Sequence, residues 1–309
     1  MSDSILQRFL AELDTVDPLA ETYSLSLWQE LTPAERELAE RALLDRIETD
    51  RDPRAIMTLA CVQSPHAQAT LEPLSQLEGF LGVWARRALL RLTGSPGDAA
   101  RVAADVHTGA TLLERFAAVS ELGHHLTVEV ANSLDAALED TDSLVRSQAL
   151  DLLIPWYKLT PYVTTSTGAN ELRSPLKVLG VRLTIDLEPV WRKAAAQIRW
   201  ILTQVEMGAR PEALDLVYHP TESPDFGEIL VDALSDSDVA LPREQILACR
   251  GHDRAWAETL LLAALEPGRS DARVPTILSQ MNTIDLPEIL EAAAAGSRNR
   301  AFLKALREL

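Results

Sequence analysis

The chain has 309 residues, of which 47% are apolar and 24% charged, a balance that excludes a disordered protein and suits one or two ordinary domains or one elongated array. Its formal net charge of −17 argues against a nucleic-acid partner, because a groove that binds phosphates needs an excess of Lys and Arg. Only 5% of the residues are aromatic and 13 are glycine, while Ala, Leu, Glu and Arg recur throughout. This usage favours helices over sheets, so we predict an all-α fold.

The amino-terminal segment "MSDSILQRFLAELD" has the apolar spacing of an amphipathic helix, and it lacks the basic start and long apolar run of a signal peptide. No stretch of the sequence approaches the length of a membrane span. Cys61 and Cys249 lie in apolar helical patterns, where a thiol usually behaves as a small core residue. We therefore expect a reduced, cytoplasmic protein with no membrane partner.

Signals for helix starts are frequent along the chain. They consist of a capping hydroxyl followed by a proline, which tolerates the first position of a helix. Glycines follow several apolar-periodic segments, where helices commonly end. Between these signals lie segments of roughly ten to eighteen residues with apolar side chains three and four positions apart, which predict about fifteen helices joined by short turns. The helix-start pairs are Thr32-Pro33, Ser64-Pro65, Ser95-Pro96, Ser174-Pro175 and Ser223-Pro224, and the glycines are Gly94, Gly123 and Gly296.

Three of these segments resemble one another. The segments "GVWARRALLRLTG" (82–94), "LLERFAAVSELG" (112–123) and "SLVRSQALDLLI" (143–154) each carry an arginine near the start, followed by small and aliphatic residues. Weaker copies place similar arginines along the rest of the chain, which indicates a repeat protein. The arginines that mark the copies are Arg54, Arg86, Arg115, Arg146, Arg192, Arg243, Arg273 and Arg300.

The pattern L-x-x-A-L-x-D-x-D-x-x-V-R-x-x-A-L-x-x-L, from Leu134 to Leu153, resembles the HEAT repeat, and in particular the short bacterial form found in phycobilisome-lyase-type proteins. The best match covers residues 80–154. The resemblance implies an α-solenoid of stacked antiparallel helix pairs, a fold used mostly to bind other macromolecules and by a minority of enzymes. In that family aspartates and arginines form a ladder between adjacent repeats, which implies the same structural role for the matching residues of this chain. These residues are Asp140, Asp142, Arg115 and Arg146.

We predict a single solenoid over residues 1–309. It begins with acidic helices at residues 1–50, continues with regular repeats at 51–154 and ends with degenerate repeats at 176–309. Residues 155–175 form an insertion with internal turn breakers and a threonine-rich centre, and an insertion of this size projects from one edge of a solenoid. Its aromatic residues are candidates for partner binding, and plugging of an irregular junction is the alternative. They are Trp156, Tyr157 and Tyr162.

Asp-x-Asp pairs occur three times in the sequence. A single acidic pair is compatible with a metal site for glycosyl or phosphoryl transfer. Each pair here lies between the end of one apolar helix and the next marker arginine, and three equivalent positions favour a structural role, in which the aspartates accept backbone N–H groups at helix starts. The pairs are Asp50/Asp52, Asp140/Asp142 and Asp236/Asp238.

Glu121 and His124 have the Glu-x-x-His spacing of di-iron helical bundles, but the sequence has no second copy of it. Gly123 is expected to end the helix before His124 and Thr127 to cap the next one, so we predict turn histidines and no metal site. The sequence also lacks the signatures of dinucleotide and P-loop sites, zinc proteases, redox cysteine pairs and serine hydrolases. We therefore predict no catalytic residues and no cofactor.

Negative charge is concentrated in two blocks. Residues 1–50 hold twelve acidic and four basic side chains, and residues 211–240 hold eight acidic side chains and no Lys or Arg, so each block has a net charge of −8. Solvated acidic helix faces are one interpretation. In the second block, however, carboxylates recur at three- and four-residue spacing and repel one another, and a basic partner would relieve that repulsion. The candidate partner-binding residues of this block are Asp225, Glu228, Asp232 and Asp236.

Three functions are compatible with this sequence. The first is a non-catalytic protein-binding solenoid, an adaptor or inhibitor of a protein with a basic surface, for example an immunity protein against a toxin. The second is a solenoid enzyme of the chromophore-lyase type, for which the sequence offers no paired acid and base. The third is a HEAT-like nucleic-acid-binding protein or DNA glycosylase, which the shortage of basic residues disfavours. We expect the first.

Overall fold

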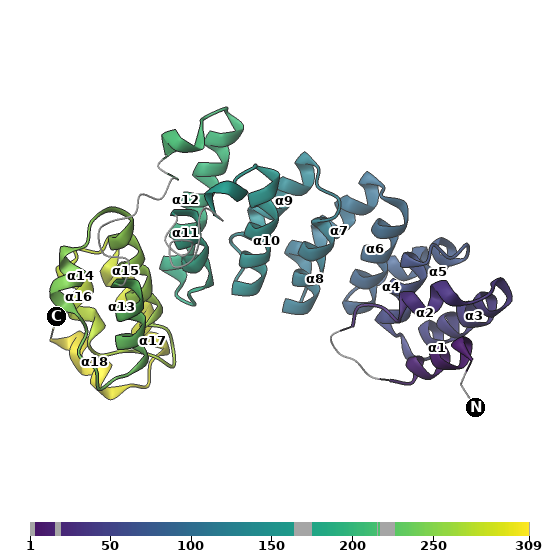
Figure 1. Ribbon diagram of the computed structural model, residues 1–309, viewed down its shortest axis with the longest axis horizontal. Helices are drawn as coiled ribbons and strands as arrows, with labels where there is room; N and C mark the ends of the chain where they lie inside the picture. The colour runs from purple at the N-terminus through teal and green to yellow at the C-terminus, as the bar shows by residue number, and fades with distance from the viewer. Residues whose placement is uncertain (1–3, 16–19, 164–174, 215, 217–225, 309) are drawn as a thin grey trace. The chain divides into compact units, whose positions relative to one another are not determined.

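The computed structural model describes residues 4–15, 20–163, 175–214, 216 and 226–308. This described part contains eighteen α-helices, two short 3-10 helices and no β-strand (Figure 1). The predicted all-α fold is confirmed, with helices that mostly pack on their neighbours in the sequence, as in an α-solenoid.

The number of helices is slightly higher than the predicted fifteen. The difference lies in short helices such as α2, α14 and α16, which have six or seven residues and fall below the segment length that the sequence pattern selects. In chain order the elements are α1 (Ile5–Leu13), α2 (Leu25–Glu30), α3 (Pro33–Asp50), α4 (Pro53–Cys61), α5 (Ala67–Ser75), α6 (Phe80–Thr93), α7 (Pro96–Thr108), α8 (Leu112–Leu122), α9 (Val128–Ala137), α10 (Ser143–Trp156), η1 (Thr160–Tyr162), α11 (Pro175–Thr184), α12 (Glu188–Glu206), η3 (Pro211–Leu214), α13 (Phe226–Ser235), α14 (Arg243–Ala248), α15 (Gly251–Ala263), α16 (Val274–Gln280), α17 (Leu286–Gly296) and α18 (Arg300–Arg307).

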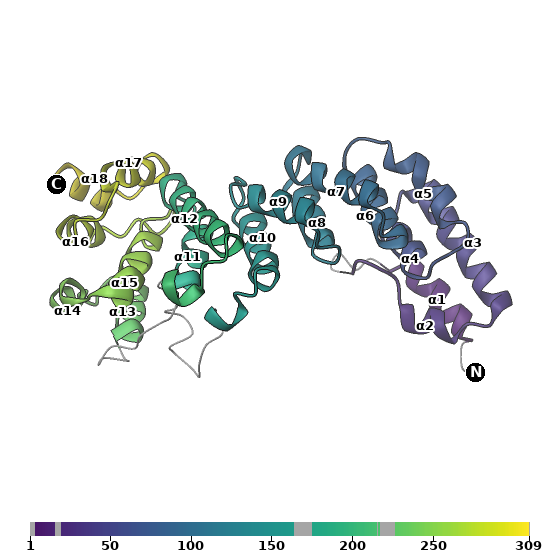
Figure 2. The same ribbon diagram turned by 90° about the horizontal axis from the view of Figure 1, so that it is seen from above.

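The helices group into two compact units, Met1–Ser133 and Leu134–Leu309. In the first unit, alternate helices form an inner layer, because α4 packs on α6 and α6 packs on α8. The connecting helices α5 and α7 pack on α6 and α8, which gives stacked helix pairs (Figure 2). Every residue of α4 from Ala55 to Ala60 is buried, so this helix lies almost wholly inside the unit.

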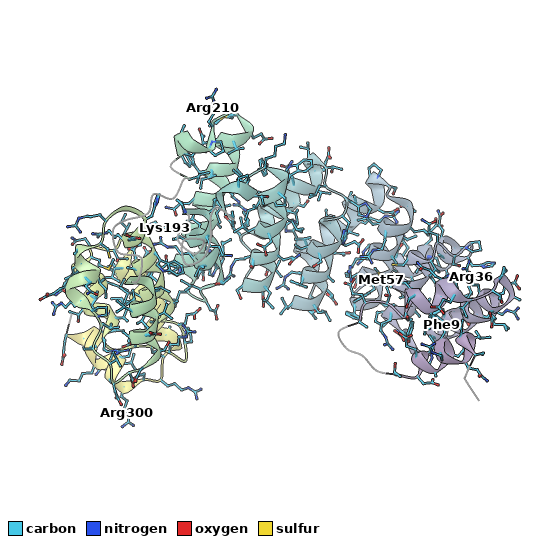
Figure 3. The ribbon with its side chains drawn as sticks, viewed as in Figure 1. Phe9, Arg36, Met57, Lys193, Arg210 and Arg300 are labelled. Carbon is cyan, nitrogen blue, oxygen red and sulfur yellow. The ribbon has the colours of Figure 1, made fainter. Side chains whose placement is uncertain are left out.

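Aromatic residues pack in the amino-terminal part of the first unit. The Phe9 ring meets the Trp28 ring edge to face with centroids 5.8 Å apart, and it meets Tyr23 in the same way at 6.4 Å. Such pairs stabilise a core beyond the area that they bury. Phe9 and Met57 lie inside the unit, whereas Arg36 lies at its surface (Figure 3).

Local capping chemistry sets several helix starts. Thr32 and Ser95 accept backbone N–H groups at the starts of α3 and α7, each followed by a proline in the first turn, as predicted. Ser64 does not start a helix at Pro65; its hydroxyl donates to Glu40, and α5 begins two residues later. Ser174, Ser223 and Pro224 lie outside the described residues, whereas Pro175 is the first residue of α11.

The second unit is less strictly sequential than the first. Helices α10, α11 and α12 pack in chain order, but α11 also packs on α15, and α12 packs on α17. One buried apolar cluster joins the start of α12 to the helices from α13 to α18, and it runs from Ile185 after α11 to Phe302 in α18. The chain therefore folds back on itself in this unit, which brings α11 and α12 opposite α15 and the start of α17.

None of the described helices is both long enough and apolar enough to cross a membrane.

Candidate functional site

The Asp-x-Asp pairs bind backbone groups. Asp142 caps α10 and accepts the Leu144 N–H at 2.9 Å, while Asp140 accepts the Asp142 N–H at 2.7 Å. In the third pair, Asp236 accepts the Asp238 N–H at 2.9 Å. Carboxylates used in this way order the turn before a helix and complement its dipole.

The first pair follows a different pattern. Asp52 caps α4 and accepts the Arg54 N–H at 2.8 Å, as Asp142 does in α10, but Asp50 forms an ion pair with Arg46 on its own helix. Asp52 also accepts a hydrogen bond from the buried Tyr23 hydroxyl. In the described part of the chain, no group of three or more His, Cys, Asp or Glu side chains is arranged to hold a metal ion.

Arg146 is completely buried and links elements of the second unit. Its Nε donates to the Leu183 carbonyl oxygen at 2.7 Å, and its Nη1 donates to the Asp140 carbonyl oxygen at 2.7 Å. The guanidinium lies over the Trp191 ring, 4.5 Å from the centroid. Burial lowers the pKa of Arg146, and the nearby charges of Asp186 and the Asp140/Asp142 pair partly oppose this. The two Arg146 hydrogen bonds, to Leu183 and Asp140, both end on backbone carbonyl oxygens.

Other marker arginines also donate to backbone carbonyl oxygens. Arg115 donates to Gly109 at 3.2 Å. Arg86 donates to Ser75 at 2.7 Å, and it binds both carboxylate oxygens of Asp105, at 2.7 and 2.8 Å. Asp105 lies in the last turn of α7 and matches no motif, so this partner could not be predicted from the sequence.

Glu121 lies in a buried ion cluster of the first unit and has no exposed surface. Arg91 binds both of its carboxylate oxygens, at 3.0 and 2.6 Å. The buried Arg87 lies 3.6 Å from the same carboxylate and donates to Glu21 at 2.8 Å, while His125 lies 3.8 Å from Glu121. Two arginines and two glutamates therefore balance one another inside this unit.

The pKa values in the cluster follow from burial and pairing. Burial alone would raise the pKa of Glu21, but the hydrogen bond and charge of Arg87 and the charge of Arg91 hold it below its ordinary value. Burial also lowers the pKa of His125, against the charge of Glu121. Gly123 is the C-cap of α8, so His124 lies beyond the helix that carries Glu121, as the sequence predicted.

The acidic candidates of the second block lie on and after α13. Asp232 and Asp236 are exposed, whereas Asp225 lies outside the described residues and Glu228 is described only as part of the helix backbone. The opposite side of α13, which includes the buried Leu230, packs on α15. Large apolar side chains are exposed beside the carboxylates, namely Ile229, Val231 and Val239.

The aromatic candidates of the insertion lie elsewhere in the second unit. Helix α10 continues through Pro155, which was predicted to begin the insertion, and Trp156 is its last residue. Tyr157 is the C-cap, and burial first, then the charges of Glu206 and Asp135, raise its pKa. Tyr162 ends the 3-10 helix η1, but its side chain and residues 164–174 lie outside the described part. The two candidate sets belong to different helices, since α10 packs on α11 and α13 packs on α15.

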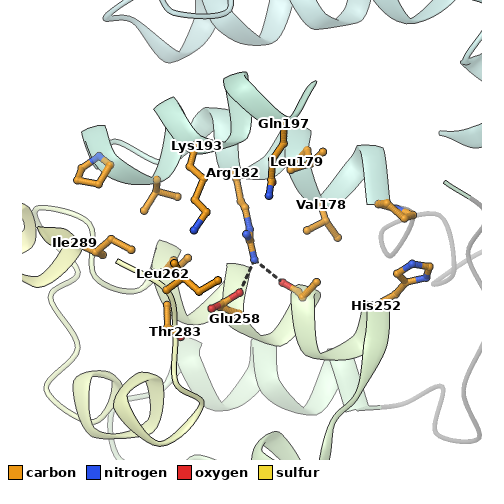
Figure 4. Close-up of a pocket in the computed structure, with 15 residues that line it drawn as sticks. Val178, Leu179, Arg182, Lys193, Gln197, His252, Glu258, Leu262, Thr283 and Ile289 are labelled. Carbon is orange, nitrogen blue, oxygen red and sulfur yellow. Dashed lines mark hydrogen bonds and ion pairs between the residues drawn. The ribbon is translucent and has the colours of Figure 1, made fainter. Parts of the chain in front are cut away.

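A cavity of about 340 Å³ opens in the second unit, where α11 and α12 lie opposite α15 and the start of α17 (Figure 4). Arg182 reaches across it from α11 to Glu258 on α15, at 2.8 Å, and also donates to Thr259 at 2.7 Å. Lys193 and Gln197 project into it from α12. Its apolar lining includes Val178, Leu179, Val190, Leu262, Ile284 and Ile289. The cavity could not be predicted from the sequence, because its walls come from segments about eighty residues apart.

Comparison of the chain with protein-family models, with curated proteins and with solved structures finds no match in any of the three. The functional inference therefore depends on the charges and geometry of this chain.

Proposed function

We propose that this protein is a non-catalytic, HEAT-like binding protein that docks a protein with a basic surface, as an adaptor or as an inhibitor of the immunity type. The observation that carries the proposal is the segment 211–240, in which eight carboxylates occur without a single Lys or Arg. Like charges on adjacent helical turns destabilise the free protein, and a basic partner offsets that cost on binding.

The described part of this segment supports the proposal with apolar surface. Asp232 and Asp236 are exposed beside Ile229 and Val231, whose side chains are 45% and 43% exposed. Interfaces combine apolar contact area with charged groups that set orientation and association rate. A surface that only kept the protein soluble would have no need of exposed aliphatic side chains among its carboxylates.

The first acidic block supplies a second charged surface in the first unit. Glu37, Asp45 and Glu48 of α3 are exposed. This block also holds four basic side chains, and Arg46 pairs with both Asp14 and Asp50. We therefore assign the larger share of partner binding to residues 211–240, which contain no Lys or Arg. The nearby cation Arg273 donates to the Asp236 carbonyl oxygen and binds the Asp271 carboxylate.

The test begins with purification of the tagged protein from its native cells at low salt, followed by measurement of the affinity of the captured partner. We expect a basic protein whose affinity falls steeply with rising salt, since exposed charges are screened beyond a Debye length of about 8 Å at physiological ionic strength. Reversal of four carboxylates to lysine should abolish capture and leave the helical circular dichroism spectrum intact. The four are Asp225, Glu228, Asp232 and Asp236.

The matched control changes the same number of charges outside both acidic blocks. Carboxylates between residues 80 and 130 are unsuitable, because Asp105, Glu114 and Glu121 are buried. Exposed alternatives are Glu78, Glu244, Glu291 and Glu308. Capture that survives the reversal in 211–240, or that the control abolishes equally, contradicts the proposal. Capture lost only on truncation of 156–174 would move the binding site to the insertion.

A further inference from the structure

The cavity in the second unit has the size and lining of a small-molecule site. Ligand sites are concave, mostly apolar and about 300 Å³ or larger, with a few polar groups that fix orientation. This cavity measures about 340 Å³, and a few charged and polar side chains project into its aliphatic lining. We propose that it binds a small organic carboxylate with an unbranched aliphatic chain. The proposal is independent of protein docking, because none of the proposed partner-binding residues lines the cavity.

The charge of the lining favours an anionic head group. Arg182 and Lys193 line the cavity with two positive charges and Glu258 with one negative charge, and Asp285, which does not line it, pairs with Lys193. The cavity and its partner Asp285 are therefore neutral together, in a chain whose net charge is −17. An ionic group enters an apolar cavity only when an opposite charge meets it there. A cationic ligand would meet one carboxylate of the lining, Glu258, which already binds Arg182, and the nearby Asp285 lies outside the lining and binds Lys193.

Lys193 is the cation that remains able to accept a ligand. Arg182 is committed, since it donates to Glu258, to the Thr259 hydroxyl and to the Ala255 carbonyl oxygen at 3.2 Å. Lys193 binds Asp285 at 2.9 Å, but the two side chains are 35% and 48% exposed, and exposed pairs of this kind are weak. An ammonium group has three donors, so the ligand carboxylate can bind Lys193 beside Asp285.

The other groups of the cavity fit the remainder of the ligand. Gln197 lies one helical turn beyond Lys193 on the same face of α12, where its amide can donate to the second carboxylate oxygen. The Lys193 ammonium points across the cavity toward Leu262 (Figure 4). Ile284 also lines the cavity, and its side chain is 69% exposed. An aliphatic chain that starts at Lys193 would cover Leu262 and Ile284 and remove their surface from water.

The test measures binding to the full-length protein by isothermal titration calorimetry. The probes are octanoate and octylammonium, which share the chain and differ in the sign of the head group. We expect octanoate to bind at least about tenfold more tightly than octylammonium, a ratio that corresponds to about 1.4 kcal/mol. Lys193→Met should weaken octanoate binding by a similar factor, and Lys304→Met, on the exposed end of α18, should leave it unchanged.

Ile284→Ser tests the aliphatic part of the site at a position too exposed to affect folding. It should weaken octanoate binding several-fold and leave the preference for octanoate over octylammonium intact. Absence of octanoate binding at millimolar concentration, equal binding of the two probes, or undiminished binding by Lys193→Met would each overturn the proposal.

Discussion

An arginine and a glutamate from different helices pair in each of the two units, and the two pairs differ in their surroundings. In the first unit Arg91 of α6 binds Glu121 of α8, whose side chain is 0% exposed. In the second unit Arg182 of α11 binds Glu258 of α15, whose side chain is 21% exposed and lines the open cavity. The residue types and distances are nearly the same, at 2.6 and 2.8 Å.

Burial of the carboxylate, more than the pairing itself, distinguishes the structural ion pair at Glu121 from the pair at Glu258, which lines the cavity. Glu121 balances Arg91, which is 25% exposed, and the buried Arg87, and water does not reach the Glu121 carboxylate itself. Glu258 keeps partial access to solvent, so water can compensate a lost bond there. Removing one partner of a buried pair leaves an uncompensated charge, which costs several times more than breaking an exposed pair.

The largest effect is expected for Glu121→Ala. The substitution leaves Arg87 and Arg91 without their buried acceptor, so we expect the free energy of unfolding to fall by about 3–5 kcal/mol. Urea unfolding followed by far-ultraviolet circular dichroism measures the change. The matched variant Glu258→Ala should cost at most about 1 kcal/mol. Equal losses for the two variants would show that burial does not distinguish the pairs.

The variant Arg146→Ala tests whether burial also raises the cost of losing an arginine that binds backbone carbonyl groups. The change removes the donors of the Leu183 and Asp140 carbonyl oxygens and the contact with Trp191, so we expect a loss of about 2–4 kcal/mol. Arg192→Ala is the control, because Arg192 lies over the same ring at 5.5 Å but is 65% exposed. A loss within about 0.5 kcal/mol for Arg146→Ala, as for a surface residue, would rule out its structural role.

The buried hydroxyl group of Tyr23 is expected to make stability depend on pH. Burial and its hydrogen bond to Asp52 raise the pKa of Tyr23 from 10.0 to about 12. The folded state therefore holds the Tyr23 proton more tightly than the unfolded state does. The contribution of Tyr23 to the free energy of unfolding is complete below pH 10 and is lost as pH rises from 10 to about 12. The loss should be on the order of 2 kcal/mol.

Tyr23→Phe is the control for this pH dependence. The variant keeps the aromatic ring and lacks the hydroxyl proton that titrates. Its free energy of unfolding should therefore fall less between pH 10 and 12 than that of the unchanged protein, and the difference is the contribution of Tyr23. Denaturant unfolding of both proteins across this range measures the difference. Parallel curves would show that Tyr23 does not titrate with a raised pKa.

Features set by neighbours in the sequence could be predicted. The caps at Thr32, Ser95 and Asp142 depend on hydrogen bonds that span two or three residues, and the end of α8 before Gly123 follows from local backbone preference. Helical periodicity likewise gave the fold class, because each helix buries one face against its neighbours.

Contacts between distant segments could not be predicted in the same way. Leu183 lies 37 residues after Arg146 in the sequence, and nothing local marks its carbonyl group as the acceptor. The cavity requires α11 and α12 to meet α15, although about eighty residues separate its walls. One signal was available for the buried pair: Arg91 and Glu121 are thirty residues apart, which is the length of one repeat.

The arginine contacts with backbone carbonyl groups bear on how the sequence of this chain can change over time. Every residue type has the carbonyl oxygen that Arg86 finds at Ser75, Arg115 at Gly109 and Arg146 at Asp140. A mutation at Ser75 or Asp140 therefore leaves the accepting oxygen in place, whereas replacement of the arginine destroys the bond. Gly109 differs, because a Cβ atom there would lie 2.9 Å from the Cγ of Arg115. The side chains at positions such as Ser75 and Asp140 are therefore freer to diverge than Arg86 and Arg146, whose guanidinium groups make the bonds.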